Sequence, residues 1–107
     1  MDKLSPRQRA HLKSLAHPLK PIVQIGRDGV TAAVVKSVEH AFQQRELLKV
    51  KVLESAPDDP HAVADGLAAV IEGVHIVQVI GRTLVLYRRH PIQPEIELPD
   101  KGPISDS

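Results

Sequence analysis

The feature that most constrains this chain is a Gly-x-x-Gly loop, Gly26 to Gly29, between an apolar run and a helical pattern. The run 22–25 predicts a short buried strand, and apolar residues at helical spacing after Thr31 predict a helix. Paired glycines let a ligand approach the main chain closely, and the helix start directs N–H groups and a positive dipole end there. With Arg27 and Asp28 inside it, the loop is therefore predicted to bind phosphate.

Further patterns predict two more helices and three more strands. Ser5 and Pro6 form a helix start, and that helix should end near Ala16 because the next residue precedes a proline. Asp59 and Pro60 start another helix, which ends before Gly73. The helix after the glycine loop should span 31–44, and the three further strands are predicted over 48–52, 74–80 and 83–88, the last two joined by a hairpin.

This order, α-β-α-β-α-β-β, predicts an α+β domain in which helices lie on a small four-stranded mixed sheet in two layers. The length of 107 residues fits one domain, which we place at residues 1–99. Within the proline-rich stretch 89–99, only Ile96 and Leu98 are expected to dock on the domain. Residues 100–107 are expected to form a disordered tail.

Charge is distributed unevenly along the chain. Residues 1–51 contain ten Lys/Arg and four Asp/Glu, a net of +6, whereas residues 52–107 contain four and nine, a net of −5. Such a split indicates one side that faces a polyanion and one that repels it, unless folding mixes the two halves. The chain has only two aromatic residues, so it is not expected to stack several bases of a single strand.

Several basic residues are candidates for RNA contact, although each could be an ordinary solvated charge. Lys49 and Lys51 share one face of a predicted strand, where two lysines repel each other unless an anion is near. His17 either shapes the turn before Pro18 or contacts phosphate. The first helix contributes an excess of positive charge through Arg7, Arg9 and Lys13.

Three blocks of sequence resemble one known family. They are residues 4–31, with LAHPLKP and IGRDGVT, residues 46–52, ELLKVKV, and residues 77–88, VQVIGRTLVLYR. In this order they resemble the CRM domain (chloroplast RNA splicing and ribosome maturation), most closely its bacterial single-domain, YhbY-type members. The resemblance extends over nearly everything up to about residue 99, and the acidic, proline-bearing tail is not part of it.

The resemblance implies an RNA-binding domain with a fold similar to the C-terminal domain of translation initiation factor three. It places the family's glycine loop at 26–29 and adds Lys20, Arg82 and Arg88 to the basic surface. Bacterial members are associated with precursors of the large ribosomal subunit. We therefore expect a cytoplasmic, monomeric binder of structured ribosomal RNA within a pre-ribosomal particle.

Two rival functions remain open at this stage. A protein-interaction module that docks on a ribosome-associated protein would show an exposed apolar patch and weak salt dependence. A small phosphate-handling enzyme would need a general base near Gly26, and only Asp28 is available. Catalysis has little support, and the six histidines lack the spacing of a helical metal site, so no catalytic residue, metal, cofactor, small-molecule substrate or membrane contact is expected.

Overall fold

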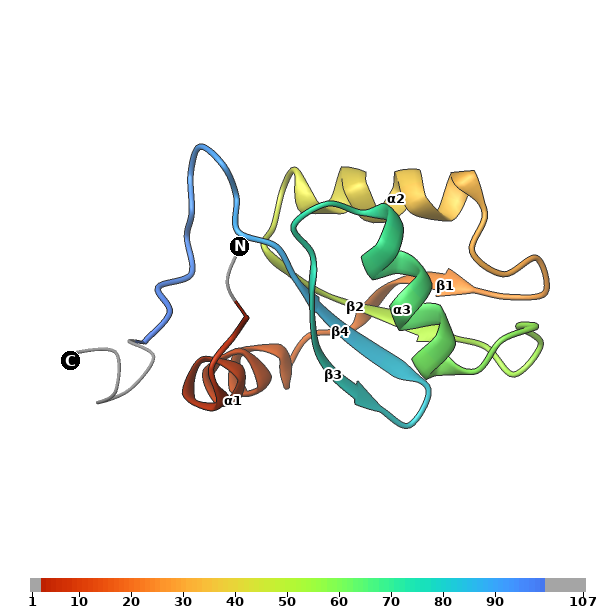
Figure 1. Cartoon of the computed structure of the whole chain (residues 1–107), viewed down its shortest axis with the longest axis horizontal. Helices are drawn as coiled ribbons and strands as arrows, with labels where there is room; N and C mark the ends of the chain where they lie inside the picture. The colour runs from red at the N-terminus through yellow and green to blue at the C-terminus, as the bar shows by residue number, and fades with distance from the viewer. Residues whose placement is uncertain (1–2, 100–107) are drawn as a thin grey trace.

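The computed structural model describes residues 3–99 and confirms the predicted element order (Figure 1). The predicted tail, 100–107, lies outside the described residues. In the part of the chain that is described, no helix is long and apolar enough to cross a membrane. The elements are α1 (Pro6–Ala16), β1 (Pro21–Ile25), α2 (Ala32–Phe42), β2 (Leu47–Val52), α3 (Pro60–Val70), β3 (His75–Ile80) and β4 (Thr83–Tyr87).

Each helix begins where a side chain supplies an acceptor for a backbone N–H of the first turn. Ser5 and Gln8 form a reciprocal capping box at α1, with the Gln8 N–H donating to Ser5 Oγ at 3.1 Å. Thr31 caps α2 and Asp59 caps α3 in the same way. Proline occupies the first position of α1 and α3, where no intrahelical N–H bond is lost.

The four strands form one mixed sheet in the order β1-β2-β4-β3. The pair β1–β2 is parallel, because α2 carries the chain back to the starting end of the sheet. The pairs β2–β4 and β4–β3 are antiparallel. Gly81, at φ +59°, starts the tight turn of the β3–β4 hairpin, and Arg82 keeps a negative φ, as a type II′ turn requires.

Alternate residues of the central strands supply two separate cores. Leu48, Val50 and Val52 of β2 face the core beneath α2 and α3, while Leu47 faces a second core beneath α1. Figure 1 shows α2 and α3 over one face of the sheet and α1 against the other. The predicted α+β fold with a mixed sheet is thus confirmed, and α1 adds a partial third layer that the two-layer prediction did not distinguish.

The segment after β4, residues 89–99, packs back on the domain, and we call it the C-terminal strap. Ile96 and Leu98 contact the core beneath α1, as the sequence predicted. At the end of the strap, Gln8 Nε2 donates to the Pro99 carbonyl at 3.1 Å. The strap therefore completes the layer that α1 begins on this face of the sheet.

Candidate nucleic-acid interface

The Gly-x-x-Gly loop is a tight turn at the carboxyl end of β1. The Gly29 N–H donates to the Gly26 carbonyl at 2.9 Å, and Gly29 adopts φ +69°. Gly29 is buried against Pro57, whereas Arg27 and Asp28 are exposed at the tip. In Figure 1 this loop and the loop that follows β2 project at the same end of the sheet.

This geometry limits which parts of the loop can bind a phosphate. The sequence-based expectation of two open glycines is only partly met, because the Gly29 N–H already has an acceptor and the residue is buried. Gly26 is different, since its φ is not positive and an added Cβ would make ordinary contacts with Leu53 and Ser55, at 3.6 and 3.7 Å. An anion therefore has access to the Arg27–Asp28 tip, and the fold itself does not require glycine at 26.

Arg9 holds α1 on the sheet. The register of β3, an edge strand, shifts between Ile76 and Gln78 at a β-bulge. Arg9 Nη1 donates to the Ile76 and Val77 carbonyls at 2.7 and 2.8 Å. This candidate RNA contact thus has a structural role that sequence alone could not indicate.

We expect Arg9→Met to lower the free energy of unfolding by about 1–3 kcal/mol, because two charge-assisted hydrogen bonds are lost. The control is Arg7→Met on the same helix, where the side chain is exposed and the change should stay within about 0.5 kcal/mol. Urea unfolding of both variants gives the comparison. Equal effects of the two substitutions would contradict the anchoring role.

Two more of the candidate cations also bind backbone carbonyls. Lys49 Nζ donates to the His17 and Leu19 carbonyls at 3.3 and 3.0 Å, which satisfies the carboxyl end of α1. Arg82 donates from Nε and Nη2 to the Val52 and Leu53 carbonyls, each at 2.8 Å. The expected repulsion between neighbouring lysines on β2 is thereby reduced, because Lys49 turns toward α1.

Arg88 lies apart from the other candidates. It follows β4 at the end of the sheet opposite the glycine loop, about 17 Å away by the six-residue length of β2. Its guanidinium carbon lies 5.0 Å from the centroid of the Phe42 ring, on the side of α2 and α3. The structure therefore does not bring Arg88 together with the loop or with Lys51.

The candidate cations that remain exposed gather on α1 and its connector, on β2 and at the loop. They are Arg7, Lys13, Lys20, Lys51 and Arg27, and the candidate His17 is exposed beside them. Residues 3–27, which build α1, the connector and β1, contain no Asp or Glu at all. The α1 side of the sheet is therefore predominantly cationic, with Asp28 at the loop tip and the strap acids Glu95 and Glu97 as exceptions.

The opposite layer carries acids. Four exposed carboxylates lie on α3 or beside its ends: Asp58, Asp59, Asp65 and Glu72. Because α3 and α1 cover opposite faces of the sheet, folding keeps the acids of α3 apart from the cations of α1, although α2 lies on the α3 side and the strap on the α1 side. A polyanion is attracted to the α1 side and repelled from the α3 side.

Both aromatic rings are inaccessible to a base. Phe42 and Tyr87 are each 1 % exposed, and they are the only Phe, Tyr or Trp residues of the chain. Burial, together with the nearby Glu46 carboxylate, raises the pKa of the Tyr87 hydroxyl. Tyr87 packs beside His75, with ring centroids 6.0 Å apart. Tyr87 is thus a core residue and not a stacking platform.

Sequence reasoning missed Glu46, which fastens the strap. Its carboxylate, in a residue only 4 % exposed, accepts the N–H groups of His90, Glu95 and Ile96 at 2.7, 2.8 and 2.7 Å. Burial by itself raises the pKa of this carboxyl, but the three N–H donors and the nearby His90 outweigh it and leave the pKa below the ordinary value. The only signal in the sequence was an acid directly before an apolar strand.

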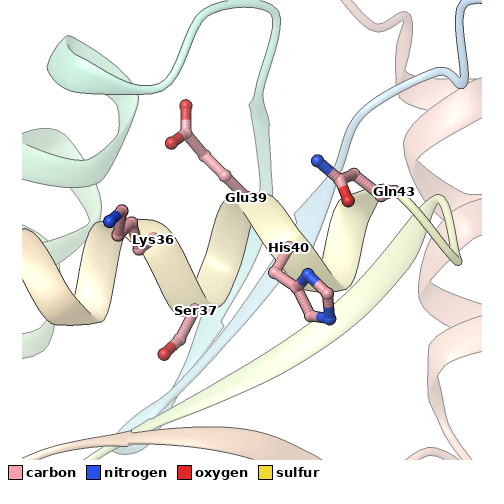
Figure 2. Close-up of a pocket in the computed structure, with 5 residues that line it drawn as sticks. All are labelled: Lys36, Ser37, Glu39, His40 and Gln43. Atoms are coloured by element: carbon pink, nitrogen blue, oxygen red, sulfur yellow. The ribbon is translucent and has the colours of Figure 1, made fainter.

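A depression on the outer face of α2 does not form a second site. It is lined by Lys36, Ser37, Glu39, His40 and Gln43. Figure 2 shows Glu39 and Gln43 pointing to one side of the helix and Ser37 and His40 to the other. These side chains do not converge on a common point, as a catalytic group and its partner would have to.

Large apolar side chains are exposed at scattered positions. Val70, Ile80 and Ile92 lie on α3, β3 and the strap, and Ile22 on β1. Leu15 and Leu19 share one depression, which Leu47 and Ile96 also line. This is a small surface for the protein-docking alternative, which predicts one contiguous apolar patch.

The protein is therefore a small α+β domain of a class that can bind polyanions. Its features are a bulged mixed sheet, a cationic face and a glycine loop. The CRS1 / YhbY (CRM) domain matches residues 4–88, and the chain belongs to this family. It is 40% identical over 98 residues to "Probable RNA-binding protein YqeI" of Bacillus subtilis, covering 90% of this chain and 99% of the relative. It is 37% identical over 101 residues to an "RNA-binding protein" of Haemophilus influenzae, covering 94% and 100%.

The fold is also similar to a solved structure, that of a Staphylococcus aureus protein determined in solution. The two share 40% sequence identity with a TM-score of 0.75, over 90% of this chain and 99% of the other. The similarity thus extends beyond the family match and includes most of the strap.

Proposed function

We propose that this protein is a non-enzymatic RNA-binding module that holds structured RNA on its α1 side. The observation that carries the proposal is the segregation of charge between the two faces of the sheet. The exposed candidate cations lie on α1, its connector, β2 and the glycine loop, while four of the exposed acids lie on α3 or beside its ends. The names of the relatives from Bacillus subtilis and Haemophilus influenzae support RNA as the polyanion.

The glycine loop and the sheet contribute differently to this binding. Arg27, at the exposed loop tip, is free to reach a phosphate, and Lys51 projects from the same sheet face that α1 covers in part. Three other cations stabilise the structure of this surface, since their charged groups are bound to backbone carbonyls: Arg9, Lys49 and Arg82. We therefore assign direct contact to the exposed cations and structural support to these three.

The test is charge reversal of Arg27 with a matched control. We expect Arg27→Glu to weaken binding of a ribosomal RNA fragment roughly tenfold, because an attractive phosphate contact becomes repulsive. Arg89→Glu makes the same change at an exposed site at the other end of the sheet and should alter the affinity less than about twofold. Fluorescence anisotropy at one fixed salt concentration measures both variants.

Salt dependence gives a second readout of the same interaction. The logarithm of the binding constant should fall linearly with the logarithm of salt, by about 0.7–0.9 per phosphate contact. Arg27→Glu should lower this slope by about one contact. An unchanged affinity and slope in Arg27→Glu would remove the loop from the interface, and a flat salt response of the wild type would overturn polyanion binding altogether.

We further propose that the RNA is a precursor of the large ribosomal subunit, as the resemblance to bacterial YhbY-type members implies. Crosslinking in cells followed by sequencing of the bound RNA tests this proposal. Enrichment of large-subunit precursor sequences is the expected result. Enrichment of other RNA would retain the binding function but refute this target.

The alternative is a protein-docking module that uses the depression at Leu15 and Leu19. It predicts that Leu15→Glu abolishes association with the particle while Arg27→Glu does not. The proposed function predicts the reverse order of effects, so sedimentation of the two variants with pre-ribosomal particles separates the two functions.

A further inference from the structure

One strip of the sheet on the α1 side is left uncovered. The strand register aligns Gln24 of β1 with Lys51 of β2, Lys51 with Thr83 of β4, and Thr83 with Ile80 of β3. These four residues thus form a single row across all four strands. Adjacent strands are about 4.8 Å apart, so the row is about 14 Å long.

The row faces solvent, unlike the rows beneath α1. Gln24 and Lys51 are exposed, Thr83 is half-buried and Ile80 is 55 % exposed. Farther along β4 on the same face, Val85 and Tyr87 are buried in the core beneath α1. The helix therefore covers one end of this face and leaves the end beside the glycine loop open.

The side chains of this row limit what it can bind. It offers one ammonium group, one amide and one hydroxyl, with an apolar residue at the β3 end, and it contains no carboxylate. The amide and the hydroxyl each donate and accept hydrogen bonds. Because both aromatic rings are buried, the row cannot hold splayed bases by stacking.

Resting on the proposed function, we propose that this row recognises the ribose edge of A-form RNA. The wide, shallow minor groove of an RNA duplex presents 2′-hydroxyl groups, which both donate and accept hydrogen bonds, on a surface that a flat sheet can approach. Gln24 and Thr83 pair with the 2′-hydroxyls, and Lys51 between them binds a flanking phosphate. The ligand class is therefore duplex RNA, in preference to duplex DNA or single-stranded RNA.

The test uses the double variant Gln24→Met/Thr83→Val, which keeps side-chain volume and removes the hydrogen-bonding groups. The probes are an RNA duplex of about 16 base pairs, a DNA duplex of the same sequence and one RNA strand alone. The full chain is used, and circular dichroism and thermal unfolding confirm that each variant is folded. Gln43→Met, on the outer face of α2 (Figure 2), is the matched control.

We expect the wild type to bind the RNA duplex at least about tenfold more tightly than the other two probes. The double variant should bind the RNA duplex about tenfold more weakly, by roughly threefold per lost hydrogen bond. Its affinity for the DNA duplex and its salt slope should be unchanged. Lys51→Met should instead weaken the binding of the RNA duplex and of the DNA duplex by the same factor. It should also lower the slope of the salt dependence by about one contact.

Failure of this inference differs from failure of RNA binding itself. If the wild type binds all three probes equally, or if the double variant keeps its preference for the RNA duplex, recognition of the ribose edge by this row is refuted while RNA binding stands. If no probe binds in a salt-dependent manner, the proposed function fails as well, and the surface is left for a protein partner.

Discussion

Replacing Glu46 with alanine is expected to lower the free energy of unfolding by about 2–4 kcal/mol. The carboxylate accepts three backbone N–H groups of the strap at 2.7–2.8 Å. Alanine leaves those donors without their acceptor, and the strap loses its attachment beside Tyr87 and α1. Urea unfolding followed by circular dichroism measures the change.

The Glu46→Gln variant separates the charge from the shape of the side chain. Glutamine retains one acceptor oxygen at nearly the same position, so about half of the loss is expected. Hydrogen exchange at the amides of His90, Glu95 and Ile96 should accelerate in both variants before the rest of the sheet is affected. If the free energy of unfolding of Glu46→Ala is within about 0.5 kcal/mol of the wild-type value, these hydrogen bonds do not hold the strap.

The same carboxylate gives the fold a defined dependence on pH. Because the pKa of Glu46 is lowered in the folded state, its contribution to stability is complete above the ordinary carboxyl pKa of about 4.3. That contribution is lost as the pH falls through the folded-state value. The wild type should therefore lose stability more steeply than Glu46→Gln below about pH 4.5, and parallel curves would contradict this account.

The second large effect is expected at Gly29. Alanine there must adopt φ +69°, which costs about 1–2 kcal/mol, and its Cβ would lie 3.1 Å from Pro57 Cγ. The two effects together should destabilise the domain by about 2–3 kcal/mol. Thermal unfolding of Gly29→Ala measures this loss.

Gly26→Ala is the matched control for that experiment. Its backbone has no positive φ and its Cβ would make only ordinary contacts, so stability should be unchanged or rise by a few tenths of a kcal/mol. A loss of RNA affinity in the stable Gly26→Ala variant would show that close approach to the main chain matters at 26. Equal destabilisation by the two substitutions would contradict the different roles assigned to the two glycines.

Local signals were sufficient to predict most of the element boundaries. Ser5, Asp59 and the prolines that follow them start α1 and α3 at the predicted residues, because capping depends on only a few neighbouring residues. The strand order was not predictable in this way. The parallel pairing of β1 with β2 and the placement of α1 on the opposite face depend on contacts distant in sequence.

The same distinction applies to the candidate site. Sequence identified the cations but could not distinguish Arg27, which is exposed, from Arg9 and Arg82, whose guanidinium groups bind carbonyls of β3 and of the end of β2. The row through Gln24 and Thr83 was missed because it exists only once the register of four strands is set. Arg88 looked equivalent to the others because sequence does not show which end of a strand meets which loop.

The strap also affects where this domain should be considered to end. The match to the family domain ends at residue 88, yet Ile96 and Leu98 cover apolar surface and a buried acid depends on the amides of 90, 95 and 96. A fragment trimmed to the end of the family match would keep all seven regular elements but would leave the Glu46 carboxylate without its donors. Any isolated version of the domain should therefore retain at least the next eleven residues.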